Sequence, residues 1–175
     1  MQPWTGTAAA RLRSQQSLQS PQSKLKLLCY EELLAAQSDD YEWPVFDENT
    51  ASSLCYTSGT TGNPKGVLYS HRSTILHAYG AALPDALNIS ARDCVLPVVP
   101  MFHVNAWSIP YSGALTGCKI VFPGPQLDGK SVYELFEQEK VSLSAGVPTV
   151  WMGLLAHMKQ NGLRFSTLKR TVIGG

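Results

Sequence analysis

Residues 57–67 concentrate side chains and backbone groups that bind phosphate. The run Thr57-Ser58-Gly59-Thr60-Thr61-Gly62-Asn63-Pro64-Lys65-Gly66-Val67 contains three threonines, one serine, three glycines and one lysine. Glycine lets the backbone turn and lets its N–H groups approach a ligand closely. Hydroxyl and N–H groups donate hydrogen bonds to phosphate oxygens, and Lys65 adds a mobile positive charge. A polyphosphate is therefore the ligand that this segment suits best.

Two other interpretations of the segment compete with this one. A cluster of Gly, Ser and Thr is most often an ordinary solvated turn. A Walker A loop, G-x-x-x-x-G-K-[ST], does not fit, because Pro64 takes the place of its second glycine and Gly66 follows Lys65. Residues 51–56 before the loop and 67–69 after it look extended. The segment is therefore predicted to join two strands of a hairpin.

Residues 57–67 resemble the phosphate-binding signature of the acyl-adenylate-forming (AMP-binding) enzymes, which include acyl-CoA synthetases, luciferases and the adenylation domains of peptide synthetases. Two further motifs are similar to those of medium- and long-chain fatty-acyl-CoA ligases. They are Val98-Val99-Pro100-Met101-Phe102-His103-Val104-Asn105-Ala106-Trp107 and Ala145-Gly146-Val147-Pro148-Thr149-Val150-Trp151. The resemblance covers residues 27–175. Three motifs in the right order make it specific and outweigh the solvated-turn interpretation.

The resemblance implies a reaction in two steps. A fatty-acid carboxylate attacks the α-phosphate of ATP to give acyl-AMP and pyrophosphate, and the thiol of coenzyme A then displaces AMP. ATP, Mg²⁺ and coenzyme A are the implied cofactors and co-substrates, with the coenzyme A site mostly outside this chain. The protein must position two groups that repel each other and neutralise their charge. A homodimer is compatible with the full-length enzyme.

The same resemblance assigns roles in triphosphate binding. Lys65 and the loop would hold the β- and γ-phosphates, with Lys65 as a catalytic residue. The other loop contacts to nucleotide are Ser58, Gly59, Thr60, Thr61 and Gly62. Thr57 matches the position that helps to hold Mg²⁺, which bridges the phosphates. The alternative for Thr57 is a hydroxyl that caps its own loop.

A second group of candidate residues concerns the carboxylate and the adenylate. His103 follows the carboxyl end of a predicted strand, where ligands bind in open α/β sheets. The matching histidine of the family would orient the acyl carboxylate; the alternative is a packed core residue. Trp107, four residues on, is expected on the same helical face, as a gate to the acyl tunnel or as core. Val104 would contact the nucleotide, and Gly174 and Gly175 would line its adenine and ribose, where a Cβ would obstruct.

Other side chains are weaker candidates. Four of them would line an apolar acyl tunnel or belong to the core: Val147, Trp151, Tyr111 and Leu115. Arg72 is a further possible phosphate contact. The remaining histidines, at positions 71, 77 and 157, have no metal-ligand spacing and are assigned to the surface or the core.

Composition excludes several classes of function. Fourteen basic and 13 acidic side chains in 175 residues nearly balance, so no nucleic acid or anionic membrane is attracted. The four cysteines form no C-x-x-C pair and lie in apolar surroundings, which indicates buried, reduced thiols in a cytoplasmic protein without a cysteine metal site. No apolar run approaches the roughly 18 residues of a transmembrane span. The partners expected are small-molecule substrates.

The pattern of elements predicts an α/β fold. Strands are expected at 51–56, 93–99, 119–122, 141–145 and 169–173, and helices at 71–83, 104–116, after Ser131 and at 149–158. Ser70 and Ser131 are the predicted N-caps. Strands that alternate with helices indicate a mostly parallel sheet covered by helices on both faces.

Three regions divide the chain. Residues 1–26 lack acidic side chains and are interpreted as a disordered leader or an appended remnant, with an organelle transit peptide as the alternative. Residues 27–49 are a short strand and helix followed by an acidic linker. Residues 50–175 are expected to be a partial N-terminal AMP-binding domain.

The sequence ends directly after a predicted strand, whereas family members continue through a Tyr-Gly-x-Thr-Glu motif to a mobile C-terminal domain. We therefore expect an incomplete subdomain of an adenylate-forming enzyme that does not adenylate acids alone. One alternative is a naturally short, non-catalytic nucleotide-binding module. Another is a ligase for an aryl or short sulfur-containing acid.

Overall fold

The computed structural model describes residues 28–57 and 62–174, and the chain divides into two units, Met1–Val45 and Phe46–Gly175. The described part of the first unit contains helix α2 (Tyr30–Ala35). The strand predicted just before this helix is wrong for residues 28 and 29, which pair with no other strand in the described part of the chain. Beyond α2, the rings of Tyr41 and Trp43 meet edge to face at 5.1 Å.

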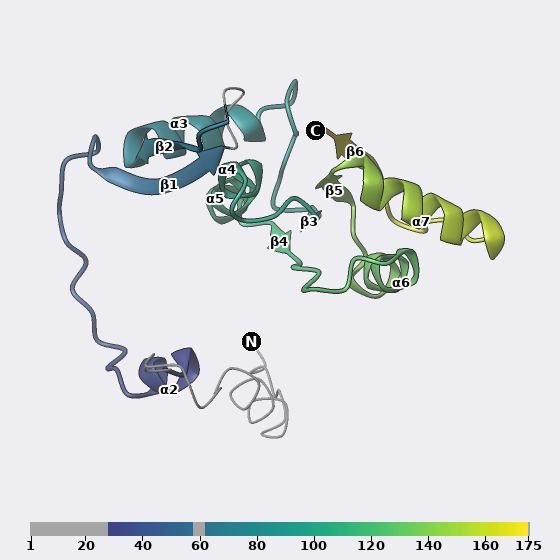
Figure 1. The fold of residues 1–175 in the computed structure, drawn as a ribbon, viewed down its shortest axis with the longest axis horizontal. Coiled ribbons are helices and arrows are strands. Elements are labelled where there is room, and N and C mark those ends of the chain that lie inside the picture. Colours follow the sequence, from purple (N-terminus) through teal and green to yellow (C-terminus); the bar gives the residue numbers. More distant parts are fainter. Residues whose placement is uncertain (1–27, 58–61, 175) are drawn as a thin grey trace. The chain divides into compact units, whose positions relative to one another are not determined.

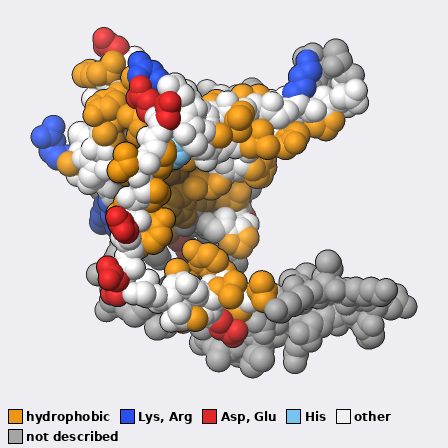
Figure 2. Space-filling view, turned by 90° about the vertical axis from the view of Figure 1, so that its left-hand side faces the viewer, with side chains coloured by type: hydrophobic (Ala, Val, Ile, Leu, Met, Phe, Trp, Pro, Cys, Tyr) orange, Lys and Arg blue, Asp and Glu red, His pale blue; other side chains and the backbone are white. Residues whose placement is uncertain are grey.

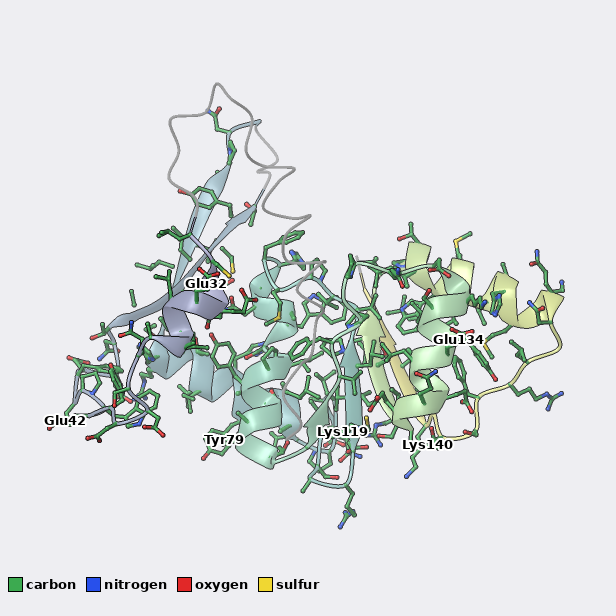
Figure 3. The ribbon with its side chains drawn as sticks, turned by 90° about the horizontal axis from the view of Figure 1, so that it is seen from below. Glu32, Glu42, Tyr79, Lys119, Glu134 and Lys140 are labelled. Atoms are coloured by element: carbon green, nitrogen blue, oxygen red, sulfur yellow. The ribbon has the colours of Figure 1, made fainter. Side chains whose placement is uncertain are left out.

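The second unit begins with the predicted hairpin. Strands β1 (Ala51–Thr57) and β2 (Lys65–Ser70) pair antiparallel (Figure 1). The hairpin extends beyond helix α3 (His71–Ala82), which follows it directly (Figure 3). Ser70 caps α3 as predicted: its Oγ accepts from the N–H of Ser73, and the Ser73 Oγ accepts from the N–H of Ser70. This reciprocal pair satisfies two of the donors that a helix start leaves free.

A separate four-stranded sheet forms the centre of the unit, in the order β4-β3-β5-β6. The strands are β3 (Cys94–Pro97), β4 (Lys119–Ile120), β5 (Leu143–Gly146) and β6 (Arg170–Ile173). All of its pairings are parallel, and every residue of the two inner strands, β3 and β5, is buried. Burial on both faces is what a parallel sheet with helical crossovers requires.

Successive residues of β3 and its extension point into two different core clusters. Leu96 and Val98 join a cluster built with helices α6 (Gly129–Glu139) and α7 (Pro148–Gln160). Val95 and Val99 join a second cluster that contains Ala106 and residues of the segment after it. Since alternate strand residues face opposite sides of a sheet, the two clusters lie on its two faces. The predicted α/β fold, a parallel sheet covered on both faces, is confirmed.

The start of α6 corrects one prediction. Asp128, not Ser131, is the N-cap: its carboxylate accepts from the N–H groups of Lys130 and Ser131. Ser131 lies three residues inside and donates its own hydroxyl to Asp128 at 2.6 Å. A carboxylate accepts from several donors at once, which makes it the stronger cap at this helix start.

Hydrophobic side chains are abundant at the surface of the described residues (Figure 2). Helix α3 illustrates this: Ile75, Leu76 and Tyr79 are all exposed, and Figure 3 labels Tyr79 on its outer side. None of the helices among the described residues is long and apolar enough to cross a membrane.

Candidate functional site

The hairpin places two of the predicted triphosphate contacts opposite each other. Thr57, the last residue of β1, pairs in register with Lys65, the first residue of β2. Both are exposed. Gly62 has φ +90°, and a Cβ there would meet nothing within 4 Å, so the backbone angle rather than packing favours glycine. Ser58, Gly59, Thr60 and Thr61 lie outside the described residues.

The segment after β3 departs from the predicted helix. Five consecutive residues, Val104 to Ser108, have φ between 47° and 61°, in the left-handed region. A right-handed helix, α5, covers only Ile109–Thr116, so the helix predicted over 104–116 is wrong in its first five residues. We call residues 104–108 the left-handed turn; its first four residues carry the label α4 (Val104–Trp107) in Figure 1. His103 precedes it with extended backbone, so His103 and Trp107 do not share a face of a right-handed helix.

Several contacts hold the left-handed turn, which is costly for residues other than glycine at roughly 1–2 kcal/mol each. The Asn105 Nδ2 donates to Ser53 Oγ of β1 at 2.8 Å. Ala106 is fully buried. The Ser112 hydroxyl lies 3.2 Å from the carbonyl oxygens of both Ser108 and Ala78, linking the end of the turn to α3. Contacts from distant parts of the chain therefore maintain a conformation that local preference disfavours.

Trp107 lies against Gly174, just after β6. A Cβ built on Gly174 would be 3.0 Å from Cη2 of the indole and 3.2 Å from Cζ2. The N–H of Gly174 donates to the carbonyl of Gly146, at the end of β5, at 3.3 Å. The structure thus brings two of the predicted nucleotide-site residues together, at the carboxyl edge of the sheet. Gly175 lies outside the described residues.

His103 is exposed, and its backbone N–H donates to the carbonyl of Pro100 at 3.0 Å. This places it in the turn that follows β3, on the same edge as Gly146 and Gly174. Ligands bind in open α/β sheets at the carboxyl ends of the strands. The position of His103 therefore favours a ligand contact over a packed core histidine.

A cavity of ≈ 180 Å³ lies between the hairpin, α3 and the left-handed turn. Its lining residues are Tyr69, Ser73, Thr74, His77, Val104, Asn105 and Ser108. Sequence reasoning missed His77 and Asn105 as members of this group, because only the fold brings their separate segments together. The four expected tunnel residues do not line this cavity. Among them, Trp151 packs edge to face on Phe136 in the core, with ring centroids 6.2 Å apart.

The remaining candidates have structural partners. Arg72 forms an ion pair with Glu48, which precedes β1, instead of pointing a free charge at the loop. The imidazole of His71 lies 4.6 Å from the ring of Phe46. Of the cysteines, Cys55 and Cys94 are buried, whereas Cys29 and Cys118 are only partly so, which corrects the expectation that all four are buried. Burial raises the pKa of both the Cys94 and the Cys118 thiol.

A polar network lies at the amino ends of β3, β5 and β6. Burial would raise the pKa of Asp93, but hydrogen bonds from Ser142 and Ser90 and the charge of Arg170 outweigh it and lower that pKa. The Arg170 Nη2 lies 2.9 Å from Asp93 Oδ1 and also donates to the carbonyl of Asn88. These contacts join three neighbouring strands at the edge opposite the candidate site, so we assign them to stability.

With this geometry established, comparison with known proteins identifies the family. The family described as "AMP-binding enzyme" matches residues 5–175. The chain belongs to the AMP-binding enzymes. The match begins nearer the N-terminus than the resemblance over residues 27–175 predicted, so it includes most of the expected leader.

Two relatives of this AMP-binding enzyme are CoA ligases. A medium-chain-fatty-acid–CoA ligase from Ectopseudomonas oleovorans is 62% identical over 149 residues, which are 85% of this chain and 27% of that protein. A 3-methylmercaptopropionyl-CoA ligase from Ruegeria lacuscaerulensis is 58% identical over 146 residues, 83% of this chain and 27% of that protein. The chain therefore spans 27% of the length of each relative.

A solved structure agrees with the fold of this AMP-binding enzyme. It is the O-succinylbenzoate coenzyme A synthetase from Bacillus subtilis in complex with AMP. The TM-score is 0.67 at 25% sequence identity, and the likeness covers 83% of this chain and 36% of that chain.

Proposed function

We propose that the chain is part of an ATP-dependent fatty-acyl-CoA ligase and supplies its triphosphate loop and one wall of its adenylate site. The observation that carries the proposal is the register of the hairpin, which sets Thr57 opposite Lys65 at the base of a hydroxyl-rich loop. The 62% identity to a medium-chain-fatty-acid–CoA ligase supports the same reaction class.

In the proposed reaction the residues of the loop neutralise the negative charge of the triphosphate. Lys65 and the loop donors hold the β- and γ-phosphates, which lowers the repulsion between triphosphate and carboxylate. The exposed Thr57 hydroxyl fits one ligand position of Mg²⁺, which in nucleotide sites uses few protein ligands besides the phosphates. When bound, Mg²⁺ supplies further neutralisation of the triphosphate charge.

The other proposed contacts lie at the carboxyl edge of the sheet. His103 orients the attacking carboxylate by donating a hydrogen bond from its imidazole. Trp107 gates the acyl tunnel and meets the nucleotide. Val104 contacts the nucleotide, and Gly174 and Gly175 leave room for the adenine and ribose. Coenzyme A binds mostly to parts of the enzyme beyond this chain.

The acid has two candidates. Medium to long fatty acids are favoured by the 62% identity to the Ectopseudomonas ligase. A short sulfur-containing acid is favoured by the 58% identity to the Ruegeria ligase. The two acids differ in how much apolar surface they bury on binding, and they therefore require acyl slots of different length.

The proposal includes the organisation of the chain. Residues 50–175 would be a partial N-terminal AMP-binding domain, 27–49 a linker with a short helix, and 1–26 a leader or an appended remnant. The chain alone would not adenylate acids, because the motifs expected after residue 175 supply part of the site. The complete ligase would act in the cytoplasm and is compatible with a homodimer.

A chimera tests the function. Residues 27–175 of this chain would replace the matching segment of the Ectopseudomonas ligase, and acid-dependent exchange of pyrophosphate into ATP would be measured. We expect exchange with octanoate in the chimera and none with the isolated chain. A chimera that folds like its host but gives no acid-dependent exchange would contradict the proposal. Comparing octanoate with 3-methylthiopropionate decides between the two acids.

A further inference from the structure

The side chain of Asn105 connects the left-handed turn to strand β1. Its Nδ2 donates to Ser53 Oγ at 2.8 Å, and the Cys55 thiol donates to its Oδ1 at 3.5 Å. Alternate residues of a strand share a face, so Ser53, Cys55 and Thr57 point the same way from β1. Asn105 therefore contacts the face of β1 that ends in the proposed Mg²⁺ ligand.

Asn105 is also the residue of the turn best suited to its backbone. Asparagine tolerates the left-handed region, whereas the β-branched Val104 and the bulky Trp107 are strained there at φ 47° and 54°. A strained segment persists only when its surroundings over-determine it. Asn105 combines a low conformational cost with a hydrogen bond to a strand 52 positions away in the sequence.

The two segments that Asn105 joins hold different parts of the proposed site. Strand β1 leads into the triphosphate loop, and the left-handed turn directly follows His103 and contains Trp107. The neighbouring hydroxyl of β1, Ser52 Oγ, instead contacts Thr74 Oγ1 of α3 at 3.0 Å. Asn105 thus links the turn to β1 through Ser53 and, at the longer distance, through Cys55. Ser52 instead links β1 to α3 and to the carbonyl of Tyr69 in β2.

We propose that Asn105 is a positioning residue that sets the spacing between the triphosphate loop and the carboxylate site. The inference rests on the proposed function. Asn105 needs no contact with ATP or the acid. It acts chiefly through Ser53, by holding the left-handed turn, which follows His103 and contains Trp107, at a fixed register against β1. Errors of about 1 Å in such positioning can lower a rate by roughly 10²-fold.

Five variants of the chimera separate positioning from a merely structural role. Asn105→Gly removes the amide but keeps a backbone that enters the left-handed region freely. Ser53→Ala removes the partner hydroxyl, and the double variant Asn105→Gly/Ser53→Ala removes both. Ser52→Ala is the matched control, since it removes a hydroxyl of the same strand that contacts α3. Each is measured for single-turnover acyl-adenylate formation, for ATP affinity and for thermal unfolding.

We expect Asn105→Gly and Ser53→Ala each to slow acyl-adenylate formation by about tenfold, with ATP affinity changed less than about twofold, because the loop remains intact. The double variant should be no slower than Asn105→Gly, since loss of the amide already removes the bond to Ser53. Ser52→Ala should keep the parental rate. Ser53→Thr retains a hydroxyl at position 53 and should also form acyl-adenylate at the parental rate.

Three outcomes would overturn the inference: unchanged rates in Asn105→Gly and Ser53→Ala, additive losses in the double variant, or losses that follow the unfolding temperature across all variants, Ser52→Ala included. A parent chimera that forms no acyl-adenylate would instead show that the proposed function fails, and the inference would fail with it. The parent's own activity therefore distinguishes the two failures.

Discussion

Gly174 meets the indole of Trp107 so closely that a single added methyl group would touch the ring. The Cβ would lie 3.0 Å from Cη2 and 3.2 Å from Cζ2, tighter than ordinary van der Waals contact. The backbone N–H of Gly174 donates to the carbonyl of Gly146 in β5. An added Cβ would therefore displace the indole ring rather than the strand. The glycine thus fixes where the indole can lie.

The first prediction concerns this contact. In the chimera, Gly174→Ala should displace the Trp107 ring by a few tenths of an ångström and lower kcat/KM for the acid. If Trp107 borders the acyl slot, the loss should depend on chain length. Steady-state kinetics with acids of increasing length is the measurement.

Gly80→Ala is the control for that substitution. A Cβ at Gly80 would meet nothing within 4 Å, and the residue lies in α3. Alanine is favoured over glycine in a helix by about 1 kcal/mol, so this variant should keep activity and unfold at a higher temperature. Equal activity in Gly174→Ala and Gly80→Ala would show that the indole position is unimportant.

The second prediction concerns Lys65. Lys65→Ala in the chimera should slow adenylation by roughly 10²-fold or more, as expected for loss of a preorganised electrostatic donor. Single-turnover formation of acyl-AMP measures the step directly. Lys159→Ala, which removes an exposed lysine from the last turn of α7, is the matched control and should have no effect. Parental kinetics in Lys65→Ala would show that the Lys65 side chain does not contribute to adenylation.

Sequence patterns predicted the elements whose determinants are local. The hairpin follows from two extended segments around a glycine-rich loop, and the start of α3 from the serine before it. The parallel sheet follows from strands that alternate with helices. Each of these depends on residues close together in the sequence, so hydrophobic periodicity and local composition are sufficient to predict it.

Elements held by distant contacts were predicted less well. A right-handed helix from residue 104 is the local preference, but Ser53 and Gly174 lie far away in the sequence and hold the chain in a left-handed turn. His77 lies in no motif, and Asn105 has no assigned role within its motif. Only the packing of α3 against the turn places these two residues in one cavity. At α6 the error was local: two capping residues lie three positions apart, and the carboxylate outcompetes the hydroxyl.

The third prediction tests that helix start. Asp128→Ala removes the acceptor for two backbone N–H groups and for the Ser131 hydroxyl, so it should lower the unfolding temperature of the chain. Ser131→Ala removes a donor that Asp128 can do without, so its effect should be smaller. Thermal unfolding followed by circular dichroism compares the two. A larger decrease of the unfolding temperature in Ser131→Ala would show that Ser131, and not Asp128, is the effective N-cap.

The fourth prediction is a pH dependence of stability from Asp93. Its pKa in the folded chain is below the ordinary 3.8, because hydrogen bonds from Ser142 and Ser90 and the Arg170 charge outweigh the opposing effect of burial. A lowered folded pKa stabilises the fold fully above the ordinary value, and this contribution is lost as pH falls through the folded value. Asp93→Asn should therefore be less stable than the parent at neutral pH, and the difference should shrink below about pH 4.

Urea unfolding of the chain at a series of pH values measures this difference. Asp85→Asn, at an exposed position, is the control and should track the parent at every pH. The buried Asp93 connects the amino ends of β3, β5 and β6, through Ser142 and Arg170, so its loss should also weaken the pairing of the sheet edge opposite the site. A gap between parent and Asp93→Asn that stays constant from neutral pH to pH 3 would mean that the carboxylate charge does not stabilise this edge.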